Sequence, residues 1–298
     1  MNSEGVVIIA EIGECWNGEM TQARKLISVA KECGCDYAKF QTLDRTGIAA
    51  DDPERDWFLK IALDRSELEH LKEYALSVGI GFLATPEKAA QAQQLCEMGC
   101  REVKIASSCL VDDELLSFVN GRFQTVFLST GLAELDEVRQ AVGILKHVPQ
   151  LYLLHCIAEY PTGPLLEERG LVAVDERNVH LSMMELLSEA FPHAKVGYSD
   201  HTVGLLAPIA AVAAGAHVIE KHITLDRETP IRNFRCGSVY LGTDHVLSLE
   251  PDELVQMVTS IRKVEAMMGP KRWHRTEGEL KLRTFLRRRF SHNPNPGT

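Results

Sequence analysis

The sequence lacks the features that mark membrane proteins, disulfide-rich secreted proteins and nucleic-acid binders. No apolar run is long enough to span a bilayer, and residues 1–5 carry neither the basic segment nor the apolar stretch of a signal peptide. Lys and Arg number 32 against 42 Asp and Glu, and this net charge of −10 argues against a nucleic-acid partner. The eight cysteines include no Cys-x-x-Cys pair, which argues against a structural zinc site. We therefore expect a cytoplasmic protein with reduced thiols that binds neither nucleic acid nor a membrane.

What the sequence does contain is a regular alternation of short apolar strands and helical patterns. The strands are expected at residues 6–10, 36–41, 80–84, 102–106, 125–129, 151–156, 195–199 and 217–222. Eight such units predict an α/β fold of the (β/α)₈ TIM-barrel type. A doubly wound open sheet is the alternative, but neither a Gly-rich phosphate turn nor a reversal of strand order is visible. The barrel domain is expected over residues 1–270, with a last helix that begins at Pro251, and residues 271–298 are expected to be a C-terminal tail or linker stub.

Local signals predict where several elements begin. Ser66 and Glu69 have the spacing of a capping box for the helix that precedes the third strand. Pro86 is expected at the first position of the following helix, where its missing N–H is not needed. Residues 42–65 are expected to form a polar connection without helix, and the basic tail is expected to be disordered.

Two histidines end two neighbouring strands of the predicted barrel. His201 follows the seventh strand and His222 closes the eighth, with Ser199, Asp200 and Glu220 beside them. The carboxyl ends of barrel strands meet at one face, and that face holds the chemistry in this fold. A single histidine is more often a structural residue, but two converging imidazoles suit a divalent metal ion. The sequence therefore predicts a metal site at His201 and His222.

Two lysines lie inside strands that are otherwise apolar. Lys39 and Lys104 would be costly to bury unless each meets an anion or a carboxylate. One interpretation is an anion pocket for phosphate and carboxylate groups, and the other is a structural Lys–Glu pair inside the barrel. The polar residues expected at the same strand ends are Glu11, Gln41, Thr85, Ser107, Ser129, Thr130, Tyr160, Ser199 and Glu220.

At this point the sequence resembles the sialic acid synthases, the N-acetylneuraminate or nonulosonate synthase family. The resemblance covers nearly the whole chain in the right order. It rests on the segments at residues 9–13, 39–42, 104–107, 128–131, 155–162, 197–202, 219–222 and 244–251.

The resemblance implies an enzyme, a transferase of carbohydrate biosynthesis that condenses phosphoenolpyruvate with an N-acetylated amino sugar and releases phosphate. It assigns the metal, usually Mn²⁺ with Mg²⁺ or Co²⁺ as alternatives, to His201 and His222, and catalytic roles to these two residues, Glu11 and Asp244. The implied phosphoenolpyruvate contacts are Lys39, Thr85, Lys104, Ser107, Ser129 and Ser199. The implied contacts to the sugar are Gln41, Tyr160 and Asp244.

The chain departs from the family pattern at three places. Cys15 and Trp16 stand where the family has Asn-His, and Ile157 and Ala158 remove two polar groups, one of which is expected to touch phosphate. The family also continues into a small antifreeze-like domain that supplies an arginine to the sugar site of a partner subunit. We therefore expect this chain to bind phosphoenolpyruvate and metal but to condense a typical N-acetylated sugar poorly without such a domain. A homodimer and a separate antifreeze-like protein are left open as partners.

Two other functions remain open at this stage. One is a barrel that keeps the metal and anion sites but acts as a ligand-binding or partner subunit, which the departures at residues 15–16 and 157–158 favour. The other is a metal-dependent aldolase or hydrolase unrelated to phosphoenolpyruvate. The retained Lys39, Lys104, His201 and His222 favour a working synthase.

Overall fold

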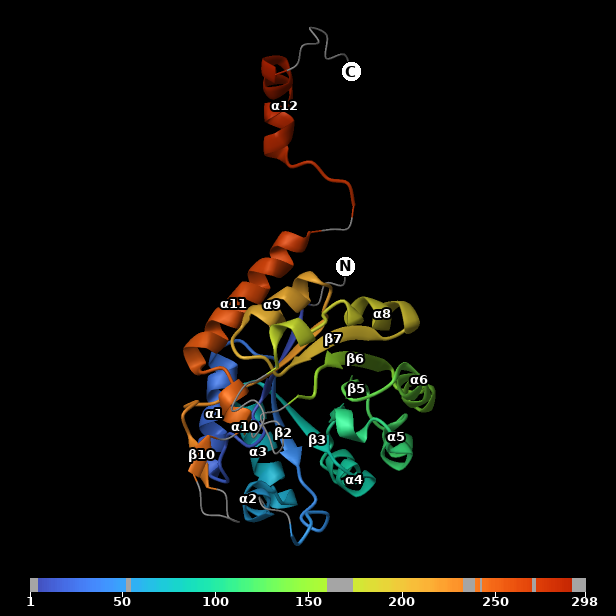
Figure 1. Cartoon of the computed structure of the whole chain (residues 1–298), viewed down its shortest axis with the longest axis vertical. Coiled ribbons are helices and arrows are strands. Elements are labelled where there is room, and N and C mark those ends of the chain that lie inside the picture. Colours follow the sequence, from blue (N-terminus) through green and yellow to red (C-terminus); the bar gives the residue numbers. More distant parts are fainter. Residues whose placement is uncertain are drawn as a thin grey trace.

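The computed structural model describes residues 5–51, 55–159, 174–232, 239–241, 243–269 and 272–290. Its central element is a sheet of eight strands. They are β1 (Val7–Glu11), β2 (Tyr37–Thr42), β3 (Gly81–Pro86), β4 (Glu102–Ile105), β5 (Thr125–Ser129), β6 (Gln150–Cys156), β7 (Lys195–Asp200) and β8 (Val218–His222). Every pairing between them is parallel, in the order β3-β2-β1-β8-β7-β6-β5-β4. Because β3 and β4 at the ends of this order also lie against each other, the sheet closes into a nearly complete barrel, as predicted (Figure 1).

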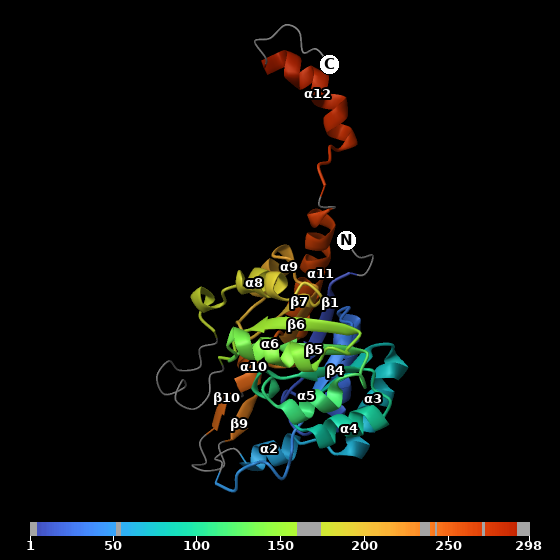
Figure 2. The same ribbon diagram turned by 90° about the vertical axis from the view of Figure 1, so that its right-hand side faces the viewer.

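Helices surround the barrel on its outer face (Figures 1 and 2). The helices that follow the strands are α1 (Met20–Glu32), α3 (Arg65–Val78), α4 (Ala89–Glu97), α5 (Asp113–Val119), α6 (Leu135–Ile144), α8 (Met183–Ala190), α9 (Leu206–Ala213) and α11 (Pro251–Met268). Shorter elements are α2 (Arg55–Ile61), α10 (Thr243–Leu247), the 3₁₀ turns η1 (Ser107–Cys109) and η2 (Glu176–Asn178), and the hairpin of β9 (Pro230–Arg232) and β10 (Val239–Leu241). A last helix, α12 (Glu277–Phe290), stands away from the barrel in both views. Within the described residues, no helix is both long and apolar enough to cross a membrane.

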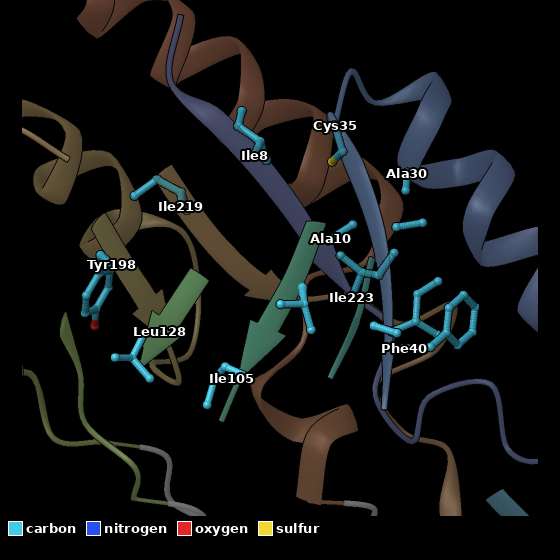
Figure 3. Close-up of a cluster of buried hydrophobic side chains, with 14 of the residues drawn as sticks. Ile8, Ala10, Ala30, Cys35, Phe40, Ile105, Leu128, Tyr198, Ile219 and Ile223 are labelled. Atoms are coloured by element: carbon cyan, nitrogen blue, oxygen red, sulfur yellow. The ribbon is translucent and has the colours of Figure 1, made fainter. Parts of the chain in front are cut away.

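The alternation of side chains along each strand separates two cores. Residues that point outward pack under the helices, and Figure 3 shows Ile8, Ala10, Leu128, Tyr198 and Ile219 in this layer. Residues that point inward fill the barrel itself, with a small apolar cluster of Ile9, Leu83, Phe127, Tyr152, Leu154 and Val218. Two residues further along each of these strands, most of the inward side chains are polar, and the candidate site begins there.

Several local predictions were wrong. The capping box of α3 is formed by Asp64 and Glu67 and not by Ser66 and Glu69, because the helix begins one residue before Ser66. Pro86 ends β3, and the next helix begins only at Ala89. The connection over residues 42–65 contains α2, whose Trp57 and Ile61 are buried.

The tail is not wholly irregular, because residues 277–290 form α12. This segment consists mainly of residues with high helix propensity, and Lys281 Nζ lies 2.8 Å from Glu277 Oε1 on the preceding turn. The start of α11 was predicted correctly. Pro251 stands in its first turn, and Gly269 follows its last residue with φ +54°.

Candidate active site

A cavity of about 320 Å³ opens among the ends of the barrel strands. The period of two places one or two inward side chains of every strand on its wall: Glu11, Lys39, Gln41, Thr85, Lys104, Ser129, Cys156, Ser199, Glu220 and His222. His201, just after β7, and Ser107 at η1 also line the cavity, and every one of these residues except Cys156 was predicted from the sequence. Tyr160 lies outside the described residues, and Asp244 stands beside the cavity rather than on its wall.

The cavity also has residues that the sequence reasoning missed. Glu87, Cys156 and Leu132 line it. The inward period of β6 could have indicated Cys156. Leu132 carries a φ of +66° and is 77% exposed, and no sequence signal marks it.

Lys39 is surrounded by three acceptors. Its Nζ forms ion pairs with Glu11 and, at 3.1 Å, with Glu220 Oε1, and donates to Thr85 Oγ1 at 2.8 Å. Glu11 lies in register with Lys39 on β2 and with His222 on β8, so the closed barrel brings these groups together. Burial acts to lower the pKa of Lys39, but Glu11 and Glu220 outweigh it and raise that pKa. An ammonium has three N–H donors, so the structure uses all of them on protein acceptors.

Lys104 is less completely engaged than Lys39. Its Nζ lies 3.4 Å from Glu220 Oε2 and donates to the Ile105 carbonyl at 3.2 Å. Burial lowers the pKa of Lys104. Burial acts to raise the pKa of Glu220, but Lys104 and Lys39 outweigh it and hold that pKa well below its usual range. The internal Lys–Glu pairing that the sequence left open is therefore present, and the contacts to described residues leave one N–H of Lys104 for a further partner.

The two histidines face each other with ring centroids 5.5 Å apart. The Nδ1 of His201 lies 2.8 Å from the Ile157 carbonyl and 3.6 Å from Cys156 Sγ. A hydrogen bond from Nδ1 to a carbonyl fixes the tautomer whose lone pair is on Nε2. The Nδ1 of His222 is buried, has no hydrogen-bond partner among the described residues, and lies 3.5 Å from Asp244 Oδ2.

The surroundings shift the pKa values of the two imidazoles in opposite directions. Burial lowers the pKa of His222 to about 3, so this ring is neutral at pH 7. Burial acts to lower the pKa of His201 too, but Cys156 outweighs it and raises that pKa to about 9, so a metal ion would have to displace a proton from this ring. Burial raises the pKa of Asp244 as well.

These two rings fit a metal ion in their donor chemistry. His222 carries an orphaned buried nitrogen, and His201 has its tautomer fixed by a backbone carbonyl, as metal-binding histidines do. In the part of the chain that the structure describes, no group of three or more His, Cys, Asp or Glu side chains is arranged to hold a metal. Among the described side chains, His201 and His222 would be the ligands of such an ion.

Asp200 does not belong to the cavity, although the sequence places it beside the histidines. It points to the outer side of β7 and pairs with Lys221, whose Nζ lies 2.6 Å from Asp200 Oδ2. Tyr198 OH and the N–H of Thr202 also donate to this carboxylate, at 2.8 and 3.0 Å. The group is completely buried and ties the ends of β7 and β8 together, directly beside the two histidines.

The departures from the family pattern separate into two kinds. Cys15 and Trp16 are buried in the core, with at most 2% exposure, and neither reaches the cavity wall. Ala158 does line the cavity, and Ile157 contributes its carbonyl to His201. A change in the site is thus confined to residue 158, which offers a methyl group where a polar group was expected.

Comparison with known proteins identifies chains that are similar in sequence and in fold. The sequence model of the NeuB family matches residues 26–272. The chain is 37% identical to an uncharacterised protein of Methanocaldococcus jannaschii, over 89% of this chain and 73% of that protein. It is 33% identical to the N,N'-diacetyllegionaminic acid synthase of Legionella pneumophila, over 94% and 78% of the two chains. Among solved structures, the N-acetylneuraminic acid synthetase of Leptospira borgpetersenii superposes with a TM-score of 0.82 at 29% identity, covering 97% of this chain and 94% of that one.

Proposed function

Because this chain belongs to the NeuB family of nonulosonic acid synthases, we propose that it condenses phosphoenolpyruvate with an N-acetylated amino sugar and releases phosphate. The observation that carries the proposal is the buried hydroxyl of Ser129. Among the residues that the structure describes, its Oγ has no hydrogen-bond partner, and it lies on the wall of a cavity that also holds Lys104 and Ser107. A buried donor without a partner costs stability unless a ligand satisfies it.

The anion side of the proposed site lies at β4 and β5. Lys104, Ser107 and Ser129 supply an ammonium N–H and hydroxyls, which are donors suited to phosphate and carboxylate oxygens. Gly131 allows the loop after β5 to approach this side, since a Cβ there would lie 2.7 Å from Ser107 Oγ. Thr85 and Ser199 complete the proposed contacts to phosphoenolpyruvate, and Lys39 adds positive charge while its donors hold Glu11 and Glu220 in place.

The acceptor side of the proposed site is acidic. Gln41 Nε2 donates to Glu11 Oε1 at 3.0 Å, and Asp244 stands behind His222. These groups can accept hydrogen bonds from the hydroxyls of an open-chain sugar. A metal held by His201 and His222, with Mn²⁺ as our choice, would polarise the sugar aldehyde.

The proposed reaction forms one carbon–carbon bond, consumes one water molecule and releases one phosphate. The methylene carbon of phosphoenolpyruvate forms a bond to the aldehyde carbon of the sugar, whose oxygen takes up a proton. Water adds to the carbon that bears the phosphate ester and loses a proton, and the carbon–oxygen bond to phosphate then breaks. Glu11 and Asp244 are the carboxyl groups placed to hold or transfer these protons.

A phosphate-release assay tests this function. The full chain is incubated with phosphoenolpyruvate, Mn²⁺ and each of a panel of N-acetylated amino sugars. Phosphate release that requires one particular sugar supports the synthase. Tight binding of phosphoenolpyruvate without release for any sugar would instead support a ligand-binding or partner subunit, and release without any sugar would support a hydrolase.

A further inference from the structure

Glu14 follows the first strand, is buried, and lies off the cavity wall. One oxygen of its carboxylate, Oε1, accepts the backbone N–H of Asp244 at 3.1 Å. In return the backbone N–H of Glu14 lies 3.3 Å from Asp244 Oδ2. The same Oδ2 is the atom that stands 3.5 Å from His222 Nδ1. Glu14 therefore fixes both the backbone and the carboxylate of Asp244 beside this histidine.

Helix α2 also contacts Glu14. Trp57 of α2 donates its indole N–H to Glu14 Oε2 at 2.6 Å, and the contact is buried. Each oxygen of one carboxylate thus accepts an N–H from a different element, one from α2 and one from α10. A glutamine at this position would offer only one acceptor and would turn its NH₂ toward the other donor. The position consequently requires a carboxylate if both contacts are to persist.

The rest of the loop after β1 also docks on α10. Cys15 Sγ lies 3.5 Å from Ser248 Oγ, and Asn17 Oδ1 lies 3.0 Å from His245 Nε2. A side chain at Gly13 would collide with this arrangement, because its Cβ would lie 2.5 Å from Asp244 Oδ2. The loop and α10 therefore form one closely fitted unit in front of His222.

We propose that Glu14 is a positioning residue, which holds the carboxylate of Asp244 in the place where it meets the acceptor sugar. The proposal rests on the function proposed above, because that function gives Asp244 its role. Glu14 acts through Asp244 and not on phosphoenolpyruvate, whose proposed contacts lie on β2 to β5 and β7. Its loss should therefore affect the two substrates unequally.

The test compares Glu14→Gln with Trp57→Phe and with Glu19→Gln as a matched control. Glu19 lies in the same loop region, but its side chain is 64% exposed and forms only a distant ion pair. We expect Glu14→Gln to lower kcat/KM for the acceptor sugar by about ten- to hundredfold, while the affinity for phosphoenolpyruvate changes less than about twofold. Trp57→Phe keeps the contact between Glu14 and Asp244 and should lose less, and Glu19→Gln should behave as the parent.

Hydrogen exchange of the Asp244 amide gives a readout that does not require catalysis. Its N–H is the donor to Glu14, so exchange should be faster in Glu14→Gln and unchanged in Glu19→Gln. Unchanged exchange, or an equal loss of affinity for both substrates, would overturn the proposal. If the parent protein condenses no sugar, the exchange measurement still decides whether Glu14 anchors Asp244, so failure of the function and failure of the anchor are distinguishable.

Discussion

The two buried lysines should respond differently to the same substitution. Lys39→Met removes the partner of two buried carboxylates, Glu11 and Glu220. Breaking a buried ion pair by removing one member costs about 3–5 kcal/mol, because the remaining charge stays uncompensated. At about 2–4 °C per kcal/mol for a chain of this size class, the melting temperature should fall by about 6–20 °C.

Lys104→Met leaves Glu220 in contact with Lys39 and removes a weaker contact of 3.4 Å. Burial already disfavours the charged form of Lys104, since it lowers the pKa of this group. We therefore expect a loss of about 1 kcal/mol or less in stability, together with a loss of phosphoenolpyruvate affinity of at least about tenfold.

Differential scanning calorimetry and calorimetric titration with phosphoenolpyruvate measure both quantities on the same preparations. The reasoning would be refuted if Lys104→Met melted as early as Lys39→Met and still bound phosphoenolpyruvate like the parent. That result would assign both lysines to the internal ion-pair network alone.

Three further predictions follow from the same contacts. Replacing both His201 and His222 by Ala should abolish stoichiometric Mn²⁺ binding in a titration, and parent-like binding would disprove the metal assignment. Lys221→Met should cost about 3–5 kcal/mol in chemical denaturation, because it leaves Asp200 charged and completely buried, and an unchanged midpoint would contradict this. Burial lowers the pKa of His245 from 6.5 to about 4, so the unfolded chain binds a proton at a pH where the folded chain does not. The stability from this neutral ring is present above pH 6.5 and about 3 kcal/mol of it is lost as pH falls to 4, a loss that His245→Gln should remove from the pH profile of unfolding.

Much of the site could be predicted because the barrel repeats one rule. Once the strands are located, every second residue points inward, and the polar residues at strand ends gather at one face. Lys39, Lys104, His201 and His222 follow from this rule alone, without knowledge of any contact.

The predictions were wrong where two local sequence signals compete, or where a contact forms only between strands that lie side by side in the closed barrel. Two overlapping capping boxes precede α3, and Asp64 prevails over Ser66 because the helix begins at Arg65. Asp200 is an outward residue by the same alternation that was used for its neighbours, and its partner Lys221 is visible only when β8 is placed beside β7.

The contacts of Glu14 could not be predicted from the sequence. Its two donors come from residues 57 and 244, far apart in the sequence, and neither has a pattern that points to Glu14. The burial of Cys15 and Trp16 is likewise a property of the packed loop, since polar residues are what the resemblance predicts there.

The central claim is that this site makes a carbon–carbon bond from phosphoenolpyruvate. The most direct measurement uses ¹³C-labelled phosphoenolpyruvate and the accepted sugar in ¹⁸O-labelled water, with mass spectrometry of both products. We expect all carbons of phosphoenolpyruvate to appear in one acid together with those of the sugar, and the released phosphate to carry no ¹⁸O. Labelled pyruvate together with ¹⁸O in the phosphate would contradict this expectation, because the enzyme would then hydrolyse the ester at phosphorus and join no carbons.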